Sequence, residues 1–117
     1  MKSSSIKRIL EECKNKLGIE EEVRVKLRNY RSRSAFIDLK TRTIYINKNL
    51  IDLGEEVVEY LILHELIHLK LGTKLHTADF YSELYNFIPP ERLIELRSKV
   101  NRKMVDKFNQ SNQPHKE

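Results

Sequence analysis

Apolar side chains near the start of the chain recur at helical spacing. Within residues 3–17 they fall on one face of a helix, at Ile6, Ile9, Leu10, Cys13 and Leu17. The serines at 3–5 offer caps for its start, and Gly18 offers the left-handed residue that ends many helices. Because Cys13 lies on the apolar face, we expect it to pack as a small buried hydrophobe.

The next segment alternates between apolar and polar residues, which is typical of half-buried strands. Val23, Val25 and Leu27 are separated by basic residues, and two further β-prone segments follow. We predict strands at 23–27, 35–39 and 43–47, with a basic loop at 30–34 and a short turn at 40–42. That turn contains no glycine, so the sequence does not define its type.

From residue 55 to about residue 108, apolar residues again recur at helical spacing. The segment 55–71 has almost no polar face in its second half, which predicts a helix in the domain centre that ends at Gly72. We expect a shorter helix over 77–87, capped by Thr77. After a break at Pro89-Pro90, a last helix should run from Pro90 to about Phe108. Residues 109–117 are polar, and we expect them to be disordered.

These elements predict a single α+β domain with an N-terminal helix, a small three-stranded sheet and three further helices. The length of 117 residues fits one domain. The chain has no apolar run of membrane-spanning length and no signal-peptide pattern at its start. A single cysteine excludes an intramolecular disulfide and a multi-cysteine metal site, so we expect the reducing cytoplasm. A charged fraction of 33% is common in thermophiles.

Charge is distributed in three blocks along the chain. The net charge is +7 over residues 1–50, −6 over 51–95 and +4 over 96–117, which gives the overall +5. A simple basic nucleic-acid module would not be expected to place an acidic block in its middle. The blocks suggest either solvated surface faces or basic ends that dock onto an acidic centre, and we do not expect nucleic acid as a partner.

The chemistry-bearing motif is the segment His64-Glu65-Leu66-Ile67-His68. Histidines four residues apart share one helix face, so both imidazoles can reach one metal ion. Glu65 adjoins them without being a ligand, which is the position of a base that takes a proton from a metal-activated water. A shuffled chain of this composition would contain the motif roughly once in a hundred.

A catalytic zinc site needs a third protein ligand. His76 is favoured because it lies between the stop at Gly72 and the next helix, where the chain can turn back toward the metal. Asp79 and Glu83 on the next helix are the rival ligands, with Glu83 the main competitor, and Asp79 could instead accept a hydrogen bond from an imidazole. His115 lies in the polar tail, where a solvent-facing role is expected.

The segment from Leu63 to Leu69, followed by His76 and Phe80, resembles the catalytic core of the minigluzincins. These are single-domain zinc peptidase zymogens similar to the catalytic domains of certain integral-membrane metallopeptidases. The resemblance implies a minimal zincin-like fold, with His64, His68 and His76 as zinc ligands and Glu65 as general base and acid. It also implies an active-site helix with a backing helix, and a peptide or protein as substrate.

The same resemblance implies latency, because C-terminal segments block the cleft in that family. We therefore expect a catalytic domain at 1–90 and a latency segment at 91–117. The segment could act within one chain, or be exchanged in a homodimer through the Pro89-Pro90 hinge.

The oxyanion donor and the substrate-binding edge each have more than one candidate in the sequence. A donor that stabilises the oxyanion could be Tyr81, Tyr85 or Arg97, and no choice among them follows from spacing. A strand at 35–39 or 43–47 should offer an edge that pairs with extended substrate.

Two rival functions can be stated from the same residues. Arg31, Arg33 and the basic first half would suit a zinc-dependent nuclease, or a protease acting on nucleic-acid-bound proteins. Glu65 argues against the nuclease, because the endoribonuclease motif that it resembles lacks this glutamate. A purely structural zinc site would more often use four ligands and cysteines, which this chain lacks.

Overall fold

The structure is a computed structural model that describes residues 1–112, with the side chains of residues 1–106. Its elements are α1 (Ser3–Leu17), β1 (Arg24–Arg28), β2 (Ala35–Asp38), β3 (Thr43–Asn47), the 3-10 helix η1 (Lys48–Leu53), α2 (Glu55–Leu71), α3 (Ala78–Tyr85) and α4 (Pro90–Asn112). This order confirms the α+β class. The 3-10 helix η1 was not predicted, because its short apolar run lacks a recognisable period.

The sheet has the strand order β1-β3-β2, so β3 is the central strand. β3 pairs in parallel with β1 and antiparallel with β2. In the buried row of the sheet, Ile44 lies between Val25 and Ile37. In the turn from β2 to β3, the Asp38 carboxylate accepts hydrogen bonds from the amides of Lys40 and Thr41. Arg42, at the end of this turn, takes a left-handed conformation with φ 53°.

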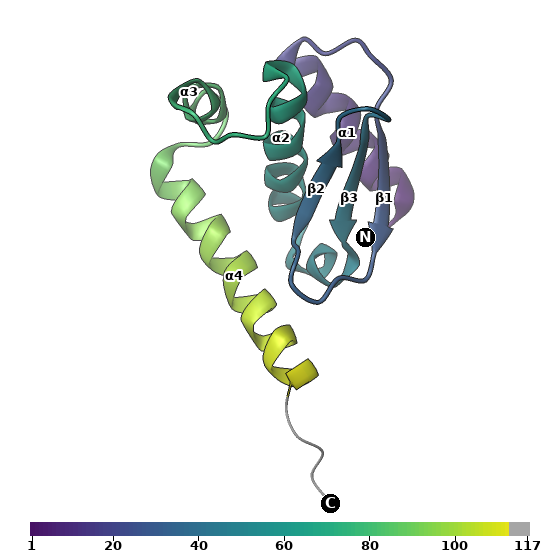
Figure 1. Cartoon of the computed structure of the whole chain (residues 1–117), viewed down its shortest axis with the longest axis vertical. Coiled ribbons are helices and arrows are strands. Elements are labelled where there is room, and N and C mark those ends of the chain that lie inside the picture. Colours follow the sequence, from purple (N-terminus) through teal and green to yellow (C-terminus); the bar gives the residue numbers. More distant parts are fainter. Residues whose placement is uncertain (113–117) are drawn as a thin grey trace, which may run out of the picture.

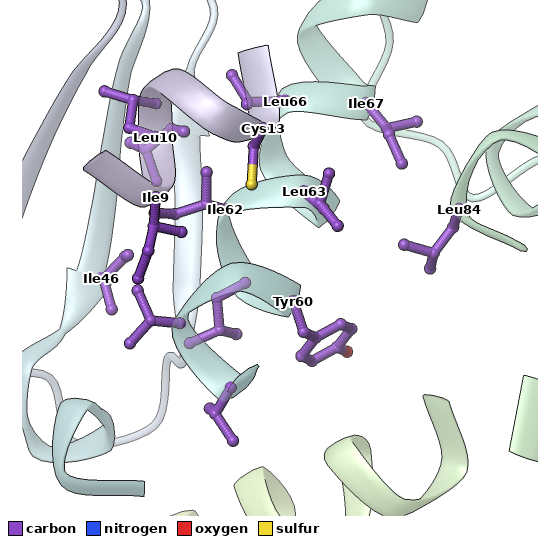
Figure 2. Close-up of a cluster of buried hydrophobic side chains, with 14 of the residues drawn as sticks. Ile9, Leu10, Cys13, Ile46, Tyr60, Ile62, Leu63, Leu66, Ile67 and Leu84 are labelled. Carbon is purple, nitrogen blue, oxygen red and sulfur yellow. The ribbon is translucent and has the colours of Figure 1, made fainter. Parts of the chain in front are cut away.

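Helices α1 and α2 cover one face of the sheet (Figure 1). Their apolar side chains meet there, and Figure 2 shows Ile9, Leu10 and Cys13 from α1 beside Ile62 and Leu66 from α2. Cys13 is fully buried, as predicted, and this burial raises the pKa of its thiol to about 12. α2 is buried on nearly all sides, as its apolar sequence predicted.

Helix α4 leaves α3 and runs past α2 toward η1 (Figure 1). Leu93, Leu96 and Val100 form its buried stripe. Two ion pairs join it to the rest of the chain, between Arg92 and Glu56 of α2 and between Lys103 and Asp52 of η1. Pro90 begins the helix, as predicted.

Several predicted boundaries require correction. α4 continues to Asn112, so the expectation of disorder from residue 109 is wrong for 109–112, and residues 113–117 lie outside the described part of the chain. α3 is shorter than the predicted 77–87. The start of α1 is capped by Lys2 without a side-chain hydrogen bond, so the predicted serine cap is wrong, whereas Gly18 ends the helix as expected. Among the described residues, no helix has the length and apolarity that a bilayer crossing requires.

Candidate metal centre

Helix α2 carries the first three residues of the site. His64 and His68 lie one turn apart on the same face, and their immediate neighbours Leu63 and Ile67 are fully buried. The side chain of His64 is 23% exposed and that of Glu65 is 7% exposed, so the site opens at His64 and is closed around the carboxylate. The apolar surroundings therefore fix the position of this face of the helix.

The turn that ends α2 orients His68. Gly72 has the left-handed φ of 67°, and the amide of Thr73 donates to the carbonyl of His68 at 3.2 Å. The chain then doubles back, so that the Thr73 carbonyl lies 2.9 Å from His68 Nδ1 and accepts its hydrogen. This bond selects the tautomer with a free Nε2, which is the form that a metal ligand needs.

The same reversal brings His76 to the site. Its Nε2 lies 3.2 Å from Nε2 of His68, and one nitrogen from each of His64, His68 and His76 lies within 4.8 Å of the others. Two nitrogens bound to tetrahedral zinc at about 2.0–2.1 Å would lie about 3.3 Å apart. The His68–His76 separation therefore matches two ligands of one zinc ion, and His64 brings a third imidazole into the same cluster.

The two competing carboxylates are elsewhere. Glu83 forms an ion pair with Lys70 at 3.0 Å, so it does not complete the histidine cluster. Asp79 is exposed in the first turn of α3, and the role foreseen for it at an imidazole is taken by the carbonyl of Thr73. Neither prediction anticipated a backbone acceptor, because only the turn geometry reveals it. His115 lies outside the described residues.

Phe80 supports all three imidazoles at once. Its ring is fully buried, stacks on His68 with centroids 4.6 Å apart, and meets His64 and His76 edge-on at 4.8 and 4.9 Å. Thr77 places this ring, because its hydroxyl accepts a hydrogen bond from the Phe80 amide and caps α3 as predicted. Burial lowers the pKa of both His68 and His76, which favours the neutral form that binds metal.

Glu65 is held beside the histidines. Its Oε2 lies 3.0 Å from Nδ1 of His64 and accepts the hydrogen there, which leaves Nε2 of His64 available as a ligand. A carboxylate at this place can orient an imidazole and exchange a proton with a group bound nearby.

A cleft of about 240 Å³ opens in front of the histidines. Its lining comes from β2's leading edge and from α2, α3 and α4, and comprises Ser34, Tyr60, His64, His76, Tyr81, Leu84, Leu93, Arg97, Val100 and Asn101. Tyr81 and Arg97, both named as oxyanion candidates, are among them, whereas Tyr85 is 44% exposed and lies outside this lining.

Sequence reasoning missed Tyr60, although its spacing of four residues before His64 places it on the same helix face. Burial raises the pKa of Tyr60, so its phenol remains a hydrogen-bond donor. Of the two strands predicted to offer a substrate edge, 35–39 and 43–47, the sheet order leaves the first. β3 is paired on both sides and offers no edge, whereas β2 is an edge strand that starts beside the cleft.

Comparison with known proteins supports a hydrolytic role for this cleft. A family model described as "YgjP-like, metallopeptidase domain" matches residues 2–103. An uncharacterized protein of Aquifex aeolicus is 39% identical over 96 residues, which cover 81% of this chain and 86% of the relative.

Two solved structures are similar to this one. The metallopeptidase zymogen of Pyrococcus abyssi, abylysin, superimposes with a TM-score of 0.80 and 31% identity, covering 86% of this chain and 95% of that one. The metallopeptidase zymogen of Methanocaldococcus jannaschii, jannalysin, has a TM-score of 0.77 and 32% identity, covering 85% and 96%. Both likenesses extend over nearly the whole fold.

Proposed function

The chain belongs to the YgjP-like metallopeptidase family, and we propose that it is a zinc-dependent endopeptidase whose zinc is held by His64, His68 and His76. The observation that carries this proposal is the convergence of three imidazole nitrogens within 4.8 Å of one another, beside a buried carboxylate. The reducing cytoplasm is the location that we propose for it.

The chain's own residues divide the chemistry. Zinc, when bound, lowers the pKa of a water ligand and polarises a substrate carbonyl. Glu65 accepts a proton from the attacking water and passes it to the amine that leaves. Tyr81 and Tyr60 both line the cleft, and we propose them as the donors for the oxyanion. Arg97 also lines the cleft, but it belongs to α4, which we propose below to be part of the latency segment.

The substrate that we propose is an extended peptide. β2 is an edge strand, and Ser34 just before it lines the cleft, so a peptide paired with β2 would lead toward the histidines. Backbone hydrogen bonds along an edge strand bind a peptide with little dependence on its sequence.

We also propose that the enzyme is latent in this form. Four residues of α4, Leu93, Arg97, Val100 and Asn101, line the cleft together with His64, so α4 narrows the space that a substrate would need. The division is then a catalytic domain at 1–90 and a latency segment at 91–117. The ion pair between Lys103 of the basic C-terminal block and Asp52 of the acidic block supports docking by charge complementarity, and Arg92 adds a second contact to Glu56.

An exchanged form follows the same logic. If the chain opened at Pro89-Pro90, α4 of one copy would occupy the cleft of a second copy, and the homodimer would be equally latent. The mass of the protein in solution distinguishes the two forms.

The test of the metal site combines metal analysis with a peptidase assay on the wild type and Glu65→Gln. We expect stoichiometric zinc in both proteins, and a loss of about 10²–10⁴-fold in the rate of peptide cleavage for Glu65→Gln. Retained activity in the variant would contradict the role of Glu65, and a wild type that binds no zinc would contradict the site.

Latency has a separate test. A chain truncated before Leu93, which removes every α4 residue of the cleft lining, should cleave an unstructured protein such as casein faster than the full chain, while it keeps its zinc. The matched control is truncation after Asp106, which leaves every residue of the cleft lining in place. No gain in the shorter chain would overturn the latency proposal without affecting the assignment of the zinc ligands.

A further inference from the structure

The outer face of the sheet, opposite α1 and α2, carries a cluster of aromatic and basic side chains. β1, β2 and β3 present it on the side that no described helix covers (Figure 1). We call it the aromatic–basic face, and it comprises Lys26, Arg28, Tyr30, Arg33, Phe36 and Tyr45. It lies outside the peptidase chemistry, so its residues require a separate explanation.

Three rings form the centre of this face. Phe36 and Tyr45 are direct cross-strand partners, and their rings stack with centroids 4.9 Å apart and an interplanar angle of 21°. Tyr30 meets Phe36 edge-on at 5.7 Å. All three are only half-buried, in contrast to the fully buried Ile44 and Ile46 on the inner face of the same strand. The rings therefore leave apolar surface in contact with solvent.

Cations surround the rings. The guanidinium of Arg33 lies 4.7 Å from the centroid of Phe36, and that of Arg28 lies 5.9 Å from the centroid of Tyr45. Lys26 is exposed and is the register partner of Tyr45 on its other side. From residue 23 to residue 37 the sequence has five basic residues and no acidic one.

The cations of the aromatic–basic face do not pair with carboxylates in the described part of the chain. On α1, Arg8 and Lys16 pair with Glu55 and Glu59 of the acidic block. On α4, Arg92 and Lys103 pair with Glu56 and Asp52 of the same block. For Lys26, Arg28 and Arg33, the described part of the chain offers no ion pair with a carboxylate. Contacts with the acidic block thus account for Arg8, Lys16 and Lys103, whereas these three cations of the sheet have no such partner.

The loop that carries Arg33 is fixed in place. The fully buried side chain of Asn47 donates hydrogen bonds to the carbonyls of Tyr30 and Arg33, both at 2.9 Å. The loop is thereby tied to the end of β3, and the aromatic–basic face is organised before any partner arrives. Such preorganisation reduces the conformational entropy lost on binding.

We propose that the aromatic–basic face binds single-stranded nucleic acid. One face of each ring is covered by the other ring, and the guanidinium groups of Arg33 and Arg28 lie over Phe36 and Tyr45. Bases would therefore stack on these guanidinium groups or take their places on the rings, and phosphates would contact Lys26, Arg28 and Arg33. Open sheet faces with exposed aromatic rings are a recurring platform for unpaired bases, and the guanidinium groups can stack on bases as well as on rings. A membrane surface or an acidic peptide would also engage the cations, and the test below includes both as competitors.

The test measures the anisotropy of a short fluorescein-labelled oligo(dT) or oligo(rU) titrated with the full-length protein at several salt concentrations. We expect saturable binding that weakens with salt. The variant Lys26→Gln/Arg28→Gln/Arg33→Gln should lower the slope of log K against log salt by about 2, since each phosphate that is no longer neutralised accounts for about 0.7. Its matched control, Lys2→Gln/Lys99→Gln/Arg102→Gln, removes the same charge from exposed positions elsewhere and should keep most of the slope.

A second variant separates stacking from charge. Phe36→Leu/Tyr45→Leu keeps every cation, so the salt slope should stay while the affinity falls by about 5-fold to 100-fold for each stacked base. The proposal is overturned if the wild type does not bind either oligonucleotide. It is equally overturned if the control triple loses as much affinity as the face triple, or if poly-L-glutamate or phosphatidylserine vesicles compete as well as the oligonucleotide does.

This inference does not depend on the proposed peptidase chemistry. Glu65→Gln should bind the oligonucleotides with unchanged affinity, because Glu65 lies beside the histidines behind the cleft. Peptide cleavage and oligonucleotide binding are measured in separate assays, so a failure of one proposal can be distinguished from a failure of the other.

Discussion

The two walls of the cleft are built in different ways. The wall formed by α2 and α3 carries the histidines, and its supporting side chains Leu63, Ile67 and Phe80 are fully buried. The wall formed by α4 rests on a single apolar stripe and two exposed ion pairs, and on the same helix Ile94 is 66% exposed and Val105 55% exposed. One wall belongs to the core, whereas the other is attached to it.

The difference shows how a small fold can combine a rigid histidine cluster with a wall that is only loosely attached. Surface ion pairs contribute about 0–1 kcal/mol each, so the attachment of α4 depends mainly on its few buried side chains. The α2 wall cannot separate without exposing the central helix. We therefore expect α4 to open in local fluctuations that leave the histidines in place.

Replacement of His76 gives the largest expected effect on this comparison. His76→Ala removes one of the three proposed ligands, so zinc affinity measured by competition with a chromophoric chelator should fall by about 100-fold or more. Glu83→Ala is the matched control, since Glu83 pairs with Lys70, and it should keep its zinc. The reverse result would assign the third ligand to Glu83 and place the metal differently.

Thiol labelling compares the opening of the two walls directly. Cys13 of α1 is fully buried. Leu96 is also buried, at 2% exposed, but it belongs to the buried stripe of α4. In a Leu96→Cys chain, the new thiol should react with iodoacetamide at least about tenfold faster than Cys13, because only α4 needs to open. Mass spectrometry of the digested protein reads both sites from one sample. Equal rates would mean that α4 unfolds with the core.

Phe80 tests whether packing on the imidazoles positions them. Phe80→Leu keeps an apolar side chain and should cost about 1.5 kcal/mol of stability or less, yet it removes the ring that contacts all three histidines. We expect zinc affinity to fall by about 10-fold. Leu84→Val in the same helix serves as the control for stability, and an equal loss of zinc affinity there would rule out a specific role of the ring.

Reversal of the α4 charges should have the smallest effect. Arg92→Glu/Lys103→Glu replaces both ion pairs with like charges, which should lower the free energy of unfolding by about 2 kcal/mol or less. The rate of casein cleavage should rise modestly, because α4 moves away from the cleft more often. Lys99→Glu/Arg102→Glu changes the same charge on the exposed side of α4 and should leave the rate unchanged.

The central part of the site was predictable because it depends on local sequence. The spacing of His64 and His68, the apolar surroundings of α2 and the stop at Gly72 are properties of neighbouring residues. β3 was predicted with its observed bounds for the same reason, since its apolar and polar residues alternate without interruption. His76 was favoured over Glu83 by its place at a helix boundary.

The remaining features depend on residues that are far apart in the sequence or on the backbone. The strand order that puts β3 in the centre is set by tertiary packing, so the edge available to a substrate could not be chosen from alternation. The acceptor for His68 is the carbonyl of Thr73, which no side-chain pattern reveals. The aromatic–basic face was invisible because Phe36 and Tyr45 meet only through the sheet register.

The sheet order also has a consequence for the path by which the chain folds. β2 and β3 are joined by a short turn, and hairpins of this kind form within about 1–10 μs. β1 must then pair in parallel with the far side of β3, with Arg24 opposite Thr43, which closes a longer loop that encloses the whole of β2. The hairpin should therefore form before β1 joins it, so that β1 docking and the packing of α1 complete the domain in a single late step.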